Sequence, residues 1–423
     1  MTSSRLTHYI FGALVLGIIV GGALSHFGAG GTLAQDYATN VSVLTEVFLR
    51  LIKMLIAPLV FATLAVGIAG MQDSSTVGRV GAKTFGWFIT MSFVSLLIGL
   101  VMVNLLQPGV GTNMPVPPAD ADTGLAKQTL TLASFVLHIF PESIFAAMAE
   151  NEILQIVVFA VFFGLAGGHL GPRGEEFFRN LDMLGHVMLR ITTMVMKFAP
   201  VAVFAAVSAV VAKNGLGVLA VYGKFMGAFY LSILVLWGVI AFAGFLMLGP
   251  SVFKLIAMLR QPLALAFTTA SSEAAYPKTL EQLERYGCEN KIASFVLPVG
   301  YSFNLDGSMM YCTFAAIFIA QVYGIEMTLS QQLVMLLMLM VTSKGIAGVP
   351  RASLVVIAAT LGSFDIPQAG ILLILAVDQF LDMARSATNV LGNGIATAVI
   401  AKWEGALDRG KESGSTVVDA RTQ

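Results

Sequence analysis

One stretch near the C-terminus, residues 368–402, is apolar except for a set of polar side chains at helical spacing. The set comprises Asp378, Asp382, Arg385, Ser386, Asn389 and Asn393. Apart from the adjacent pair 385–386, spacings of 3 and 4 place these side chains on one face of a helix. Inside a membrane, a charged face of this kind is typical of a substrate or ion path, because buried charges are costly there. The alternative is an Asp382–Arg385 salt bridge that only fixes the helix to a neighbour.

Arg385 determines which ligand would suit this face. Its planar guanidinium matches the two oxygens of a carboxylate, so the sequence predicts an anionic substrate that carries a carboxylate. Asp382 lies one turn earlier and could receive an ammonium group. A site with both charges suits an acidic amino acid better than a plain dicarboxylate.

A second polar motif, Asn304-Leu305-Asp306-Gly307-Ser308, interrupts the otherwise uncharged residues 295–323. Asn, Asp and Gly together predict an unwound turn, in which freed carbonyl groups and a carboxylate can hold a hard cation. The alternative is a polar kink that hydrogen bonds to other helices stabilise.

Two segments, 252–287 and 330–362, resemble helical hairpins and are broken at residues 270–277 and 344–351. Each arm has roughly 12–17 residues, too few to cross the bilayer comfortably, so we expect both hairpins to be re-entrant. Glu273 lies in the first break beside Ser271 and Ser272, where a partly desolvated carboxyl group could carry a proton. It could equally be a solvated residue at the hairpin tip.

The second break contains glycines and proline followed by a charged residue: Gly345, Gly348, Pro350 and Arg351. Glycine lets the backbone approach a ligand closely or open as a gate. The alternative role of these glycines is close packing between helices.

Composition indicates the class of protein that holds these motifs. Of the 423 residues, 57% are hydrophobic and 11% charged, against about 45–50% and about 25% in average soluble domains. We therefore expect an all-α polytopic membrane protein. Zero net charge argues against a nucleic-acid binder, and two cysteines are too few for a disulfide framework. The sequence has no phosphate-binding loop, no histidines at metal-ligand spacing and no nucleophile–base pair, so we expect neither an enzyme nor a cofactor.

The N-terminal part, residues 1–250, contains six apolar stretches long enough to be transmembrane helices. They are residues 9–24, 43–71, 84–106, 153–168, 184–211 and 216–248. The first follows Arg5 and could be mistaken for a signal peptide, but we expect it to be retained. Lys and Arg gather before the first stretch, in the second and fourth connections and after residue 401, which predicts cytoplasmic N- and C-termini. Residues 404–423 form the expected cytoplasmic tail.

Residues 251–403 contain the two hairpins, each followed by a long apolar helix with polar residues at mid-depth. A broken hairpin followed by a polar-interrupted helix, twice over, is typical of the inverted repeats of a secondary transporter. In total, the sequence predicts eight transmembrane helices and two re-entrant hairpins.

The four motifs occur in an order that resembles the dicarboxylate/amino acid:cation symporter family, to which the excitatory amino acid transporters belong. The similarity covers almost the whole chain and is clearest at residues 270–273, 304–308, 345–350 and 382–389. Bacterial proton/glutamate-aspartate symporters are especially similar, notably at residues 340–350 and 398–404.

The resemblance implies a homotrimer and an elevator mechanism. Helices 1, 2, 4 and 5 would form a scaffold, whereas helices 3 and 6 would join the core of residues 251–403 in a moving transport domain. Arg385 would bind the side-chain carboxylate of the substrate and Asp382 its amino group. The remaining substrate contacts would come from Asn389, Ser386, Ser271, Ser272, Gly348 and Val349. Cation or proton coupling would involve Asn304, Asp306, Asn393, Glu273 and Asp378, with a sodium site at Asn304, Asp306 and Asn389 as the alternative.

Four residues depart from the pattern of the sodium-coupled relatives. Asn393 replaces a common Asp, Phe88 and Met91 replace a Tyr and a Thr that help to bind sodium, and Arg351 replaces a small or neutral residue. The departures at Asn393, Phe88 and Met91 favour protons, with Glu273 and Asp306 as candidate carriers, whereas Arg351 would alter gating or substrate access. We therefore expect an inner-membrane symporter that imports L-glutamate or L-aspartate with protons. Within the class of symporters, the alternative is a sodium-coupled or C4-dicarboxylate symporter. The alternatives from other classes are an anion channel and a membrane receptor.

Overall fold

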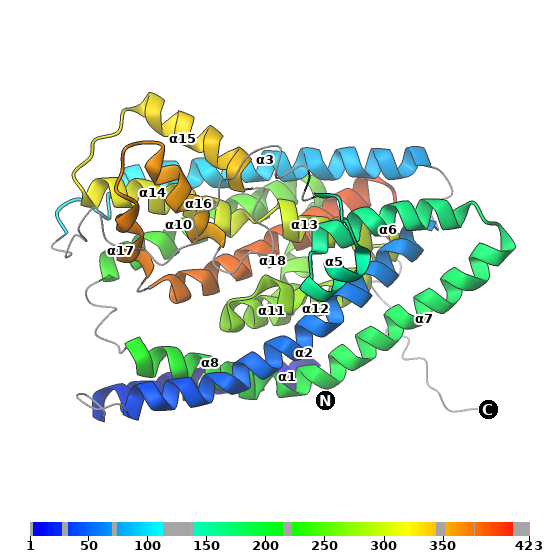
Figure 1. Cartoon of the computed structure of the whole chain (residues 1–423), viewed down its shortest axis with the longest axis horizontal. Coiled ribbons are helices and arrows are strands. Elements are labelled where there is room, and N and C mark those ends of the chain that lie inside the picture. Colours follow the sequence, from blue (N-terminus) through cyan, green and yellow to red (C-terminus); the bar gives the residue numbers. More distant parts are fainter. Residues whose placement is uncertain are drawn as a thin grey trace.

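The structure is a computed structural model that describes residues 3–27, 33–69, 74–112, 137, 139–214, 222–343, 352–375 and 377–408. These residues form helices joined by short connections, with no strand among them (Figure 1). The helices are α1 (Ser3–Phe27), α2 (Leu33–Ala69), α3 (Ser74–Leu106), α5 (Ile144–Glu150), α6 (Ile153–Gly168), α7 (Pro172–Val195), α8 (Ala199–Asn214), α10 (Gly223–Leu248), α11 (Ser251–Thr269), α12 (Ser272–Tyr286), α13 (Asn290–Phe303), α14 (Asp306–Val322), α15 (Leu329–Thr342), α16 (Ala352–Gly362), α17 (Ile371–Leu375) and α18 (Asp378–Trp403), with 3₁₀ turns η1 (Met196–Phe198) and η3 (Gln368–Gly370).

Several of these helices suit a bilayer. In the described part of the chain, five helical stretches are long and apolar enough to cross a membrane: Ser75–Leu106, Gly174–Lys213, Gly223–Leu248, Ser251–Thr269 and Asn290–Val322. Large apolar side chains are exposed along the outer faces of α1, α7 and α10, among them Ile19, Met183 and Leu246. So much exposed apolar surface would be unfavourable in water and is expected of helices that face lipid.

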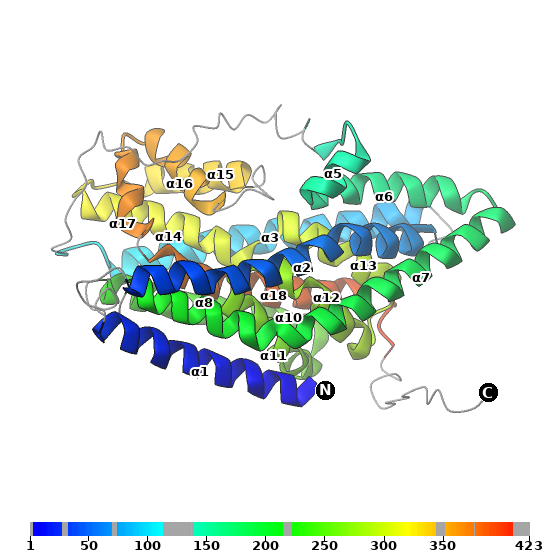
Figure 2. The same cartoon turned by 60° about the horizontal axis from the view of Figure 1, so that its bottom comes forward.

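The helices pack in two groups. In the first group, α1 lies along α8, and α2 packs against α6, α7 and α8 (Figures 1 and 2). In the second group, α18 runs through the middle and contacts α10, α11, α12, α13 and α14, while α3 packs along α14. The two groups meet mainly where α13 contacts α2 and α6, where α12 contacts α2, and where α11 contacts α8 and α1.

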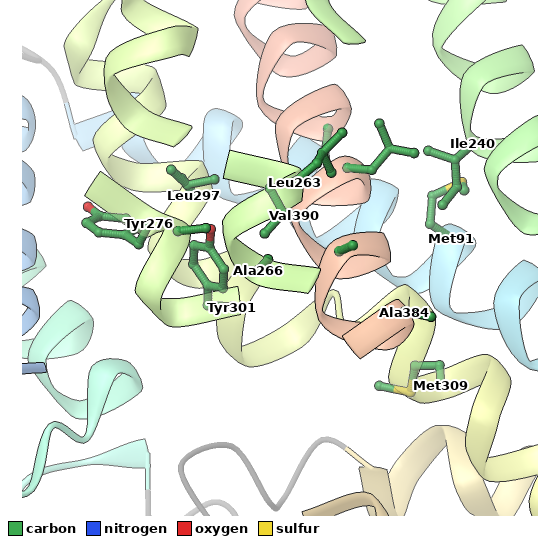
Figure 3. Close-up of a cluster of buried hydrophobic side chains, with 14 of the residues drawn as sticks. Met91, Ile240, Leu263, Ala266, Tyr276, Leu297, Tyr301, Met309, Ala384 and Val390 are labelled. Atoms are coloured by element: carbon green, nitrogen blue, oxygen red, sulfur yellow. The ribbon is translucent and has the colours of Figure 1, made fainter. Parts of the chain in front are cut away.

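The centre of the second group is α18, whose residues are buried without interruption from Ala384 to Ala401. Figure 3 shows the apolar side chains around it, including Leu263 and Ala266 from α11 and Leu297 and Tyr301 from α13. Tyr276 of α12 meets Tyr301 edge to face, with ring centroids 5.7 Å apart. A helix that is buried on every side can carry polar residues only where neighbouring groups satisfy them.

The structure corrects four details of the sequence-based elements. The first hairpin breaks only at Ala270 and Ser271, because Ser271 caps α12 and Pro277 lies inside that helix. Its first arm, α11, has 19 residues and is longer than expected. The helix expected over 368–402 starts instead as η3 and α17, and the polar face begins with the first turn of α18. The fifth apolar stretch is longer than expected and extends from α7 through η1 into α8.

An ion-pair cluster joins the end of α18 to the beginning of α3. Arg79 Nη2 lies 2.9 Å from Glu404 Oε2, and Lys83 Nζ lies 2.6 Å from Glu404 Oε1. Lys83 also donates to the Trp403 carbonyl, and the Trp87 and Trp403 rings meet edge to face. Burial by itself would raise the pKa of Glu404, but the hydrogen bonds from Arg79 and Lys83 outweigh it and lower the pKa. The carboxylate is therefore held in its charged form.

We expect Glu404→Gln to lower the melting temperature of the purified protein by roughly 2 °C at pH 7, since a partly exposed ion-pair cluster contributes about 1 kcal/mol. Because the folded-state pKa of Glu404 is depressed, this contribution is present above the carboxyl group's unfolded pKa and is lost as the pH falls through the folded pKa. The difference between the two proteins should therefore disappear in acid. Glu289→Gln is the matched control, since Glu289 pairs with Lys291 and both side chains are 42% exposed. Equal effects of the two substitutions would contradict the role of the cluster.

Candidate functional site

The candidate site forms where the start of α14 lies against the middle of α18. The backbone leaves helical geometry at Asn304 and Leu305, so the unwound turn predicted inside this stretch is confirmed. Gly307 then brings the two helices into direct contact, since a Cβ there would lie 2.6 Å from the Arg385 carbonyl oxygen. Only glycine permits this approach without displacing α18.

Arg385 is the centre of the first polar cluster. Its Nη2 atom lies 3.0 Å from Asp378 Oδ1 and 2.9 Å from Asp382 Oδ1. The guanidinium carbon lies 4.0 Å from the centroid of the Tyr311 ring, and the Tyr311 hydroxyl donates to Asp378 Oδ1 at 3.1 Å. Two carboxylates and one aromatic face therefore compensate this buried cation.

Two nitrogen atoms of the guanidinium remain without hydrogen-bond partners among the described residues. The Arg385 side chain is 3% exposed, and its Nε and Nη1 atoms are buried with no hydrogen-bond partner among the residues that the structure describes. Buried donors on a charged group are costly to leave unpaired. Asp382 is 38% exposed, whereas Asp378 is 7% exposed. The cluster thus offers N–H groups to an anion beside one accessible carboxylate.

A second polar cluster surrounds Asp306, which is fully buried at the start of α14. Ser95 of α3 donates to Asp306 Oδ1 at 3.0 Å, and Asn304 Nδ2 donates to Asp306 Oδ2 at 3.0 Å. Asn304 Nδ2 also lies 3.1 Å from Asn393 Oδ1 of α18. The residues described contain no partner for Asn304 Oδ1, so an acceptor oxygen remains in the cluster. Carboxylate and amide oxygens are the ligands that a hard cation such as sodium prefers.

Glycines of α13 and α18 make room for this cluster. A Cβ on Gly392 would lie 1.9 Å from Asp306 Oδ2, and a Cβ on Gly300 would lie 2.4 Å from Asn393 Oδ1. The polar side chains therefore rest directly on helix backbone, where any larger residue would displace them.

Asn389 lies between the two clusters. Its Oδ1 accepts from the Gly307 backbone N–H at 2.9 Å, and its Nδ2 donates to Ser308 Oγ at 3.4 Å. The neighbouring Ser386 is buried on α18. Asn389 thus connects α18 to the start of α14. Because Gly307 is next to Asp306 in the chain, this contact lies beside the second cluster.

The tip of the first hairpin carries Ser271, Ser272 and Glu273, all half-buried. Ser271 is the N-cap of α12, where its hydroxyl accepts from the Ala274 N–H at 3.2 Å. Glu273 lies in the first turn of α12, where the helix dipole favours a carboxylate. The predicted gate residues Gly345, Gly348, Pro350 and Arg351 lie outside the described residues, and so does the predicted substrate contact Val349.

Three residues of the clusters were missed in the sequence. Tyr311 supports Arg385, Ser95 donates to Asp306, and Gly392 accommodates the Asp306 carboxylate. Ser95 lies one helical turn after Met91 on α3, and this helical spacing is the sequence signal that could identify it. Phe88 and Met91 are themselves buried, and the Phe88 ring would lie 3.3 Å from a Cβ on Gly300.

Buried charged and polar clusters at a helix break inside an apolar helical bundle are typical of a membrane transporter. The sequence profile described as the sodium:dicarboxylate symporter family matches residues 6–403, and the chain belongs to this family. It is therefore a symporter, not an enzyme.

Curated relatives extend over nearly the same length. The chain is 41% identical over 418 residues to a C4-dicarboxylate transport protein of Laribacter hongkongensis, covering 97% of this chain and 93% of that one. It is 40% identical over 416 residues to a proton/sodium-glutamate symport protein of Geobacillus stearothermophilus, covering 97% of both chains. A C4-dicarboxylate transport protein of Acinetobacter baylyi is 40% identical over 414 residues, covering 94% of this chain and 91% of that one. The resemblance to the dicarboxylate/amino acid symporters is confirmed.

We expect Gly392→Ala to destabilise the protein by about 1–3 kcal/mol, because the added methyl group must displace the Asp306 carboxylate. The measurement is thermal unfolding of the purified protein. Gly238→Ala on α10 is the matched control, since nothing lies within 4 Å of a Cβ there. That control should be neutral or slightly stabilising because alanine favours helix. Equal melting temperatures for the two variants would show that Asp306 does not rest on Gly392.

Proposed function

We propose that the protein is a secondary active symporter that imports L-glutamate or L-aspartate together with protons. The observation that carries this proposal is the pair of unpartnered Arg385 donors beside the accessible carboxylate of Asp382. Arg385 would bind the side-chain carboxylate of the substrate, and Asp382 would bind its ammonium group. Ser386, Asn389 and the backbone of both hairpin tips, including Ser271, Ser272, Gly348 and Val349, would hold the rest.

Asp378 takes a supporting role in this proposal. It pairs with Arg385 and accepts from Tyr311, so it can keep the guanidinium in place while Asp382 exchanges Arg385 for the substrate ammonium group. A C4-dicarboxylate has no ammonium group, and its second carboxylate would approach Asp382 unfavourably. That substrate class is the alternative, supported by relatives named C4-dicarboxylate transport proteins.

The coupling ion is proposed to be the proton. Asp306 and Glu273 are the candidate carriers, since Asn393, Phe88 and Met91 replace residues that help to bind sodium in relatives. Asn304 and Asn393 would adjust their hydrogen bonds to the protonation state of Asp306. Sodium is the alternative, supported by the spare Asn304 Oδ1 atom and the Ser95 hydroxyl near Asp306, with Asn389 as a further oxygen ligand.

The two packing groups support an elevator-type movement in the inner membrane. The scaffold would comprise α1, α2, α6, α7 and α8, and the transport domain α3 with α10 to α18. The second hairpin, with Gly345, Gly348, Pro350 and Arg351, would close the site only when the cation is bound. Three such chains would form a homotrimer in which each chain works alone, with both termini in the cytoplasm.

Two substitutions test the substrate assignment. We expect Arg385→Ala to weaken the binding of labelled glutamate and succinate at least about 30-fold, since it removes the partner of a buried carboxylate. Asp382→Asn should weaken glutamate binding alone, because succinate has no ammonium group. Arg190→Ala, an exposed position on α7, controls for the loss of a charge. Glutamate affinity that is unchanged in Arg385→Ala would exclude the proposed role of Arg385, and equal effects of Asp382→Asn on both substrates would favour dicarboxylates.

Uptake into proteoliposomes tests the coupling ion. An inward proton gradient without sodium should accumulate labelled glutamate, and Glu273→Gln should abolish this accumulation while leaving substrate exchange intact. Accumulation that requires sodium would reject proton coupling and assign the Asp306 cluster to sodium. If Glu273→Gln still concentrates glutamate in response to the proton gradient, Asp306 becomes the carrier.

A further inference from the structure

An apolar cavity lies between helices of the two packing groups. It has a volume of about 440 Å³ and is bounded by α1, α10, α11 and α18, with Leu14, Ile233, Leu263 and Ala387 among its lining residues. This volume lies within the range of about 300–1,000 Å³ that small-molecule sites usually have. Figure 2 shows α11 next to α1, and Figure 3 places Leu263 of α11 and Ala384 of α18 in the apolar interior.

The polar groups around the cavity are engaged elsewhere. Trp237 Nε1 donates to Thr388 Oγ1 at 2.8 Å, and the Tyr230 hydroxyl donates to the Phe380 carbonyl at 2.7 Å. Thr268 donates to the Ala264 carbonyl of its own helix. The wall therefore presents hydrocarbon, and a water molecule inside would lack the two to four polar partners that it needs. The cavity suits an apolar occupant.

One charged residue, Arg260, borders the cavity. It is exposed and makes no ion pair with the residues that the structure describes. Arg260 lies nine residues after Ser251, the first residue of α11, so the two residues are about 14 Å apart along the helix axis. Basic groups between transmembrane helices recognise the phosphate of anionic lipids. A cation at the edge of an apolar cavity therefore matches the head and tail of such a lipid.

The mouth of the cavity favours a lipid with two chains over a single-chain fatty acid. Leu234 belongs to the lining and is 64% exposed, so the cavity opens at the outer face of α10. Leu231 and Val235 lie on the same face of α10 and are also exposed. One chain can enter the cavity while the second lies on these exposed side chains.

We propose that this cavity is a binding site for an anionic phospholipid, with one acyl chain between α1, α10, α11 and α18 and the phosphate on Arg260. Leu14 belongs to the first packing group, and the other lining residues belong to the second. The bound chain therefore lies across the boundary between the two groups. Its wall on α18 includes Ala384, the neighbour of Arg385 in sequence. The site does not depend on the identity of the transported substrate or ion.

Native mass spectrometry of the purified full-length protein tests this proposal with added phosphatidylglycerol as the probe. The wild-type protein should retain one phosphatidylglycerol per chain. Arg260→Gln removes the phosphate partner, and Ala264→Phe fills the cavity, so each should lower retention at least tenfold. Lys254→Gln on the same helix and Leu246→Phe on the exposed face of α10 are matched controls that should retain the lipid.

Equal retention by Arg260→Gln, Ala264→Phe and the wild-type protein would overturn the proposal. A preference for a fatty acid over phosphatidylglycerol would also overturn it. A second measurement covers the case in which Ala264→Phe folds poorly. Phosphatidylglycerol should raise the melting temperature of the wild-type protein through binding to the folded state, and this rise should be absent in Arg260→Gln. A rise of the same size in Arg260→Gln would exclude Arg260 as the phosphate partner.

Discussion

The rest of the structure depends on the burial of one guanidinium in an apolar helical bundle. Arg385 can be accommodated there only because Asp378, Asp382 and Tyr311 surround it. This requirement accounts for the geometry of the neighbouring helices. Asp378 stands in the first turn of α18, and Gly307 brings α14 close enough for Tyr311 to lie against the guanidinium. The compensation is incomplete, because Nε and Nη1 of Arg385 remain unpaired among the described residues. Such an ion cluster is stable only if the folded bundle holds it in place.

A single helix, α18, carries Arg385 with both of its carboxylates and also Asn393, which contacts Asn304 beside Asp306. Asn389 connects the two clusters through the Gly307 N–H at the start of α14. Any movement of that start would alter the hydrogen bonds of Asp306 on one side and the support of Arg385 by Tyr311 on the other. In the proposed function, this connection through the start of α14 would link the anion site at Arg385 to the cation site at Asp306.

Much of this arrangement could be predicted from the sequence, because charges in apolar helices are rare and their spacing reveals the shared face. The helix break at Asn304 and the face from Asp378 to Asn393 were found in this way. The pairing of Asp306 with Ser95 could not be predicted from the sequence, because contacts between distant segments follow from packing and not from local pattern. Tyr311 resembles any core aromatic residue in the sequence, and only the structure shows the cation beside its ring. The sequence predicts a wider break, residues 270–277, than the observed one at Ala270 and Ser271, because proline normally breaks a helix and Pro277 instead lies within the second turn of α12.

The end of the described chain has a practical consequence. The Asp408 N–H donates to the Gly287 carbonyl, and the Glu289 N–H donates to the Ala406 carbonyl, so residues 406–408 are fastened to the connection between α12 and α13. Gly287 has a φ of 110°, and a Cβ there would collide with the Asp408 carbonyl oxygen. A fluorophore or spin label attached at Asp408 would therefore report the position of that connection. Paired with a second label on α1, it would measure the separation of the two packing groups directly.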